Sequence, residues 1–137
     1  MNVLEPGYEL NESRPALPGY IASLRRVAVA FAAEAGADDL QQENIGLAIS
    51  EAVSNCVMHA YPEDGRRGDV TVEAWMDESR IFIVVSDEGR GMTPRPDSPG
   101  LGLGLPMMAR VTERLEIEDR SPGPGVRVQM TFPLRGR

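Results

Sequence analysis

Three polar residues in the middle of the chain have the types and spacing expected of a catalytic or ligand-binding site. Glu51, Asn55 and His59 follow one another at intervals of four residues, which would align a carboxylate, an amide and an imidazole on one face of a helix. An ordinary solvated helix face can present the same stripe. Two glycine-rich segments follow it, at residues 87–92 and 100–105, and the three features together favour a nucleotide-binding site.

Each polar group matches one part of a magnesium nucleotide. Mg²⁺ prefers oxygen ligands, and the side-chain carbonyl of Asn55 supplies one. Glu51, one helical turn earlier, would lie near a terminal phosphate and take a proton from an attacking hydroxyl. Asp87, at the end of an expected strand, offers an acceptor to the exocyclic amine of adenine. His59, near the helix end, is expected to be structural and to stay outside the chemistry.

The glycines predict where the backbone would approach the nucleotide. Gly89 and Gly91, which precedes Met92, leave no side chain between the chain and a purine. Five further residues alternate glycine with leucine before an expected helix: Gly100, Leu101, Gly102, Leu103 and Gly104. Backbone N–H groups there, beside the positive end of the helix dipole, suit phosphates. A plain turn and a leucine-packing loop are the alternatives, and neither segment is a Walker loop or a dinucleotide motif.

Composition excludes several classes of function. The chain has 137 residues and a formal net charge of −7, and all 14 of its basic residues are arginine. An acidic chain without a basic stripe suits nucleic-acid phosphates poorly, so we expect no direct nucleic-acid binding. The lack of lysine excludes every lysine-based phosphate loop. Any cation that meets a phosphate must therefore be an arginine or a metal.

The pattern of hydrophobicity predicts a cytoplasmic globular protein. Hydrophobic residues make up 42% of the chain and charged residues 26%, as in soluble domains. We expect one domain over residues 1–137, with a core at about 15–134. No apolar run approaches membrane-spanning length, and no signal-peptide pattern opens the chain, so we expect no membrane contact. The single cysteine, Cys56, is expected to be a small core residue in a reducing compartment.

Two helices are predicted before the first strand pair. One begins near Pro18, which suits a first helical turn, and stops at Gly36. The next is capped by Asp38 or Asp39 and ends at Pro62. The paired arginines at 25 and 26 fall off the apolar stripe of the first helix. We favour a solvated surface for them over a contact with a partner.

A sheet and a third helix complete the expected fold. The prolines of residues 93–99 exclude regular structure there, and the third helix is expected over residues 105–113. Strands are expected at four further places: 70–76, 80–86, 115–119 and 126–132. A short edge strand is expected near Tyr8 and Leu10. This order predicts helices on one face of a mostly antiparallel sheet, an α+β two-layer sandwich.

The three polar and glycine-rich segments, in this order, resemble the motifs of one ATPase superfamily. Glu51-Ala-Val-Ser-Asn55-Cys-Val-Met-His59-Ala-Tyr61 resembles the N box of the GHKL ATPases, and residues 87–92 and 100–104 resemble their two glycine boxes. Within that superfamily the N box is most similar to that of bacterial anti-sigma-factor serine/threonine kinases. The resemblance covers nearly the whole chain from about residue 15.

This resemblance implies a Bergerat ATP-binding fold, the histidine kinase-like ATPase fold, with ATP and Mg²⁺ as cofactors. Glu51 would be the general base, Asn55 would hold Mg²⁺ and Asp87 would bind adenine. The implied nucleotide-binding residues are Asn55, Asp87, Gly89, Gly91, Met92, Arg95, Gly100, Leu101, Gly102, Leu103 and Gly104. Such kinases phosphorylate a serine or threonine of an anti-anti-sigma partner and otherwise sequester a sigma factor. Relatives of this type are often homodimers.

The chain departs from the family pattern in two places. The segment between the glycine boxes is short, so only Arg95 or Arg90 could neutralise a γ-phosphate there. Many relatives carry threonine at the position of Val126, and Thr131 lies further along. These departures leave two alternatives to a kinase. One is a nucleotide-dependent binding module with little or no transfer, and the other is an ATP-binding domain of a two-component pathway.

Overall fold

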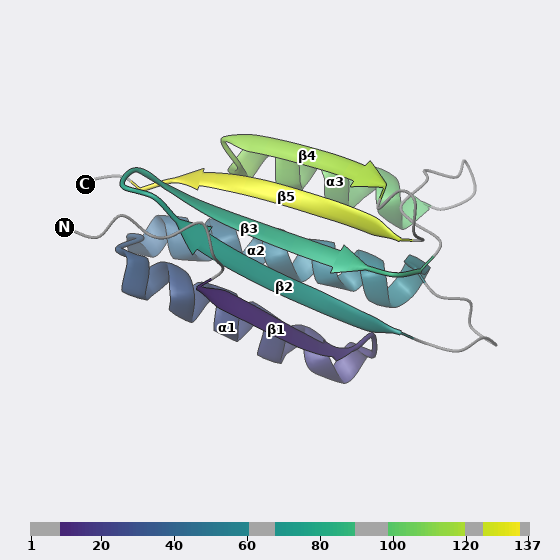
Figure 1. Cartoon of the computed structure of the whole chain (residues 1–137). Helices are drawn as coiled ribbons and strands as arrows, with labels where there is room; N and C mark the ends of the chain where they lie inside the picture. The colour runs from purple at the N-terminus through teal and green to yellow at the C-terminus, as the bar shows by residue number, and fades with distance from the viewer. Residues whose placement is uncertain (1–8, 61–67, 90–98, 120–124, 135–137) are drawn as a thin grey trace.

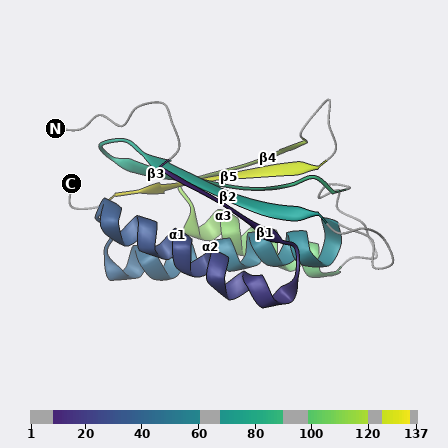
Figure 2. The same cartoon turned by 60° about the horizontal axis from the view of Figure 1, so that its bottom comes forward.

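One antiparallel sheet with helices on a single face forms the fold (Figures 1 and 2). This computed structural model describes residues 9–60, 68–89, 99–119 and 125–134, without the side chains of His59, residues 99–104 and Asp119. The elements are β1 Leu10–Pro15, η1 Pro18–Tyr20, α1 Ile21–Ala35, α2 Asp39–Asn55, η2 Cys56–Ala60, β2 Asp69–Met76, β3 Arg80–Asp87, α3 Pro99–Val111, β4 Arg114–Asp119 and β5 Val126–Pro133. The predicted α+β two-layer architecture and its order of elements are confirmed.

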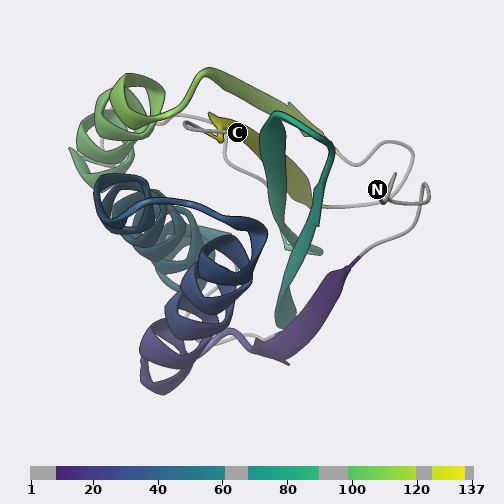
Figure 3. The same cartoon turned by 90° about the vertical axis from the view of Figure 1, so that its left-hand side faces the viewer.

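The five strands lie in the order β1-β2-β3-β5-β4, and each neighbouring pair is antiparallel. In the helical layer α2 lies between α1 and α3 (Figure 3). No helix in the described part of the chain is both long and apolar enough to span a bilayer. α2 is thus the central helix and β3 the central strand. The two pack against each other, and both end at the same end of the molecule (Figure 1).

The central strand β3 carries much of the core. Ile81, Ile83 and Val85 are fully buried and belong to the apolar cluster that the sheet shares with the helices. The register places Val85 between Val72 of β2 and Val128 of β5. Full burial of such a side chain contributes roughly 1.5–3 kcal/mol. This packing fixes β3 and therefore the position of its last residue, Asp87.

Local signals set the boundary between the first two helices, as predicted. Gly36 ends α1 in the left-handed conformation, with φ of 106°, which glycine adopts without strain. Asp38 caps α2, because its side chain accepts the Gln41 N–H at 2.8 Å while the Gln41 side-chain oxygen accepts the Asp38 N–H at 3.2 Å. A cap of this kind stabilises a helix by about 1 kcal/mol. Of the two predicted caps, Asp38 is the one used.

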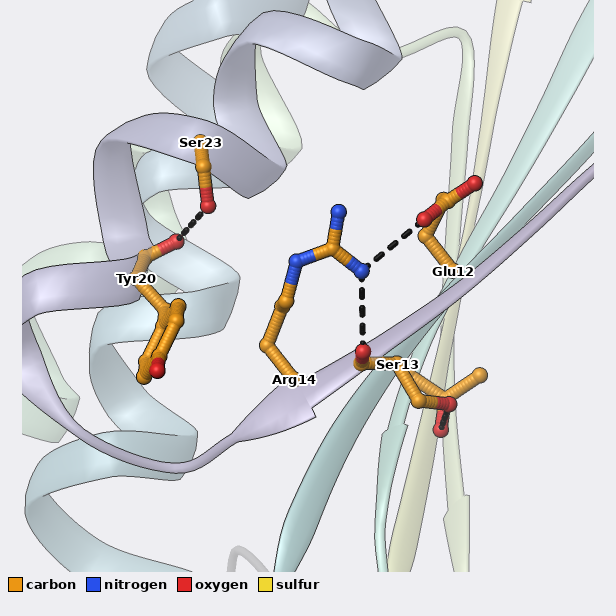
Figure 4. Close-up of polar contacts among 6 residues, drawn as sticks. Glu12, Ser13, Arg14, Tyr20 and Ser23 are labelled. Carbon is orange, nitrogen blue, oxygen red and sulfur yellow. Dashed lines mark hydrogen bonds and ion pairs between the residues drawn. The ribbon is translucent and has the colours of Figure 1, made fainter.

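Polar contacts hold the edge strand β1 and the turn that leads into α1 (Figure 4). Arg14 donates through Nη1 to Oε1 of Glu12 at 2.8 Å and to the carbonyl oxygen of Ser13 at 2.9 Å. At the start of α1, the Ser23 hydroxyl donates to the carbonyl oxygen of Tyr20 at 3.0 Å. The predicted edge strand is thus present, although it runs later in the chain than the expected position, and Tyr8 lies outside the described residues.

The third helix begins earlier than predicted. It starts at Pro99 and ends at Val111, so the helix predicted over 105–113 is present, but the predicted loop through Gly104 and the exclusion of Pro99 from regular structure are wrong. Proline suits a first helical position because the N–H there has no intrahelical acceptor. Each glycine disfavours a helix by about 1 kcal/mol, but α3 packs beside α2, and tertiary packing supplies most helical stability.

The second helix also differs from its prediction. The α-helix ends at Asn55 and continues as a π turn, η2, rather than as a regular helix to Pro62, which lies outside the described residues. A π turn holds more residues than an α turn. The predicted stacking of His59 over Glu51 and Asn55 assumed regular α geometry, which does not hold beyond Asn55. The contacts of η2 with the end of β3, described below, are tertiary and leave no local pattern.

Candidate functional site

Asn55 combines burial with an unmet hydrogen bond. It is the last residue of α2 and is only 3% exposed. Its Nδ2 has no hydrogen-bond partner within the described part of the chain. A buried donor without a partner costs roughly 1–3 kcal/mol. A ligand oxygen beside this amide would offset that cost, so the residue fits a place in a nucleotide site.

Glu51 lies one turn before Asn55 on the same face of α2. Its side chain is partly exposed, and it makes no hydrogen bond or ion pair with any other described residue. A carboxylate in this state can reach solvent and can accept a proton. The structure therefore brings the two polar groups of the central helix to one place.

Asp87 ends β3 and is only 1% exposed. Its Oδ1 accepts the backbone N–H of Gly89 at 2.9 Å, and its Oδ2 accepts the thiol of Cys56 at 3.2 Å. Cys56 follows Asn55 directly, so this bond joins the end of the central helix to the first glycine segment. The sequence identified Cys56 only as a core residue, and no local signal marks its contact with Asp87.

Burial raises the pKa of the Cys56 thiol well above its ordinary value of 9.0, and the charge of Asp87 and the hydrogen bond to it raise this pKa further. The thiol therefore stays protonated near neutral pH. A protonated thiol is a hydrogen-bond donor, and an ionised Asp87 side chain is an acceptor.

Two glycines allow the backbone around Asp87 to pack closely. A Cβ atom on Gly89 would overlap the carbonyl oxygen of Ala60, the last residue of η2. A Cβ atom on Gly125 would overlap the carbonyl oxygen of Asp87, and Gly125 also has a φ of 108°. Larger residues at either position would push η2 or β5 away from the end of β3.

The remaining predicted residues divide into two groups. Gly91, Met92 and Arg95 lie outside the described residues. The second glycine segment, residues 100–104, forms the first turns of α3, where the leading N–H groups have no intrahelical acceptor. Figure 1 shows that α3 begins at the end of the molecule where η2 and β3 end. The positive end of its dipole thus lies at the same end as Asn55 and Asp87.

The structure shows whether Thr131 of β5 could replace the threonine that many relatives have at the position of Val126. Val126 opens β5 and is 1% exposed. Thr131 lies five residues further along and pairs with Phe82. Residues an odd number apart in a strand face opposite sides of the sheet. Thr131 therefore does not take the place of Val126.

A polar hollow of about 290 Å³ lies beside Asp87, but it does not suit a nucleotide. Four acidic residues are among those that line it: Asp69, Glu73, Asp87 and Glu88. Negative charges at this density repel a polyphosphate. Neither Glu51 nor Asn55 lines this hollow, so it does not coincide with the nucleotide site that the sequence predicts.

Known proteins match this chain over most of its length. The family described as the histidine kinase-like ATPase domain matches residues 14–132. An anti-sigma F factor of Caldanaerobacter subterraneus subsp. tengcongensis is 35% identical over 118 residues, which is 78% of this chain and 80% of the relative. The serine-protein kinase RsbW of Bacillus subtilis is 31% identical over 137 residues, which is 89% of this chain and 83% of the relative.

Solved structures share the fold. The RsbU and RsbW domains of a Mycobacterium tuberculosis protein align with a TM-score of 0.69 and 25% identity, over 90% of this chain. This chain spans 31% of that longer one. The histidine kinase domain of a blue-light-activated kinase from Erythrobacter litoralis aligns with a TM-score of 0.58 and 23% identity, over 88% of this chain and 61% of that one. The second likeness supports the fold alone.

Proposed function

The chain belongs to the histidine kinase-like ATPase domain family, in its anti-sigma kinase branch, and from this premise we propose a specific activity. The protein is an ATP-binding anti-sigma factor that regulates transcription by sequestering a sigma factor. It phosphorylates a serine or threonine of an anti-anti-sigma partner. Relatives named anti-sigma F factor and serine-protein kinase support both halves of the proposal.

The observation that carries the proposal is the buried Nδ2 of Asn55 at the end of α2, which has no hydrogen-bond partner among the described residues. The Nδ2 of this buried amide can donate to an oxygen of a nucleotide, and the residue directly precedes Cys56, whose thiol contacts Asp87, at the end of the molecule where α3 begins. Bound Mg·ATP would supply the phosphoryl group and the positive charge that balances it. Asn55 would hold Mg²⁺ through its side-chain oxygen, and Asp87 would accept the adenine amine.

Glu51 would act on the protein substrate. Its carboxylate would accept the proton of the attacking serine or threonine hydroxyl. The side chain is partly exposed and makes no hydrogen bond or ion pair with other described residues, which leaves it available for this proton. Because transcription in bacteria takes place in the cytoplasm, we place the proposed activity there. We further propose that the chain acts as a homodimer, as expected for its relatives.

Two substitutions on α2 test the roles separately. Glu51→Ala should lower phosphate transfer to the anti-anti-sigma partner by about 10²–10⁴-fold and leave Mg·ATP affinity unchanged. Asn55→Ala should weaken Mg·ATP binding itself. Calorimetry measures the affinity, and transfer of labelled γ-phosphate to the partner measures the rate.

Glu43→Ala is the matched control, because Glu43 is an exposed carboxylate of the same helix. It should change neither quantity. Normal transfer by Glu51→Ala would remove Glu51 from the mechanism. A wild-type chain that binds Mg·ATP and the partner but transfers no phosphate would be a nucleotide-dependent binding module instead.

A further inference from the structure

Two hydrogen bonds among the described residues reach the Asp87 carboxylate from different directions, and one of them comes from η2, directly after the central helix. The Gly89 N–H reaches Oδ1 from within the same turn, whereas the Cys56 thiol reaches Oδ2 from η2, 31 residues earlier in the chain. Both residues of the second bond are buried, Cys56 at 0% and Asp87 at 1% exposure. Cys56 therefore acts on Asp87 from a fixed position in the core.

We propose that Cys56 is a positioning residue that determines the base specificity of the nucleotide site. The inference rests on the proposed function, because it assumes that Asp87 meets the base. The thiol donates to Oδ2 and, together with the Gly89 N–H on Oδ1, fixes the plane of the carboxylate. A site of this kind selects a purine with a 6-amino group over one with a 6-oxo group.

The selection follows from donor and acceptor chemistry. A 6-amino group donates to a carboxylate, whereas a 6-oxo group places an acceptor against an acceptor. A buried charge is costly unless hydrogen bonds compensate it. Without the thiol, the Asp87 carboxylate loses one of its hydrogen-bond donors and gains freedom to rotate. A carboxylate that can rotate no longer holds its acceptor at the position of the 6-amino group, so the preference for a 6-amino over a 6-oxo purine falls.

The neighbouring strand does not replace this donor. Gly125 packs against the backbone of Asp87, and the next residue, Val126, has an aliphatic side chain with no hydrogen-bonding group. Thr131 lies on the other side of the sheet from Val126. The thiol of Cys56 thus supplies a donor that the β5 side chain beside this site cannot supply.

The test compares two nucleotides and three variants of the full chain. Dissociation constants for ATP and for inosine triphosphate, which carries a 6-oxo group, are measured by calorimetry with Mg²⁺. Cys56→Ala removes the donor, and Cys56→Ser replaces the thiol with a hydroxyl donor. Val53→Ala is the control, because Val53 is fully buried in α2 close to Cys56 and loses packing without losing a donor. Thermal unfolding verifies that each variant is folded.

We expect the preference for ATP over inosine triphosphate to fall about tenfold in Cys56→Ala. Cys56→Ser should restore most of the preference, and Val53→Ala should keep all of it. An unchanged preference in Cys56→Ala refutes the role of Cys56 while the proposed function stands. Equal losses in the alanine and serine variants would mean that packing is responsible, which also refutes it. A wild-type chain that binds neither nucleotide refutes the proposed function, and the assignment of Cys56 with it.

Discussion

Replacing Asn55 by leucine separates function from stability at the candidate site. The buried Nδ2 has no partner among the described residues, so the wild-type chain without nucleotide carries a cost of roughly 1–3 kcal/mol there. Leucine has a similar volume and no donor, but its different shape costs up to about 1.5 kcal/mol. The free energy of unfolding without nucleotide should therefore stay the same or rise by about 1 kcal/mol.

Nucleotide should affect the two chains differently. A ligand at 100 times its dissociation constant stabilises a folded protein by about 2.7 kcal/mol. Urea unfolding with and without Mg·ATP should give this gain for the wild-type chain and none for Asn55→Leu. Val53→Ala, which removes core packing near the site, should unfold more easily and still show the gain.

One result would refute the reasoning behind this experiment. If Asn55→Leu without nucleotide is less stable than the wild type by more than about 1 kcal/mol, the amide makes a structural hydrogen bond. A full stabilisation of Asn55→Leu by Mg·ATP would remove Asn55 from the nucleotide site.

Three further predictions concern the elements around the site. Gly89→Ala should destabilise the chain by about 1–3 kcal/mol, because the new Cβ overlaps the carbonyl oxygen of Ala60. Thermal unfolding measures this loss. Gly46→Ala is the control, because a Cβ atom there would meet only ordinary contacts. Asp38→Ala should lower the free energy of unfolding in urea by about 1 kcal/mol, because α2 loses its N-terminal cap. An unchanged free energy of unfolding would mean that solvent replaces the cap. The Cys56 thiol has a raised pKa in the folded chain, so the unfolded chain releases this proton first and stability should fall as the pH rises above 9.0 toward the folded pKa. Urea unfolding between about pH 8 and pH 10 should show a shallower fall in Cys56→Ala, and equal slopes would contradict the assignment.

The sequence by itself determined the order of elements and their packing layers. The limits of α1 and α2 depend on residues within a few positions of each other, such as Gly36 and the Asp38 cap. The near-continuous apolar run of β3 indicated the most buried strand, because a strand with neighbours on both sides and a helix layer on one face favours apolar residues. The roles of Glu51 and Asn55 also come from spacing within one helix, and they remain predictions for the binding and transfer assays.

Only the tertiary structure decided how the central helix meets the first glycine segment. The π turn after Asn55, the early start of α3 and the bond from Cys56 to Asp87 were not predicted. Each depends on contacts between segments far apart in the chain, and the last joins residues 31 positions apart. Periodicity and propensity report on neighbours within about one turn. They cannot indicate that a small apolar-looking residue lies against a buried carboxylate, because the partner is chosen by the packing of a helix on a sheet.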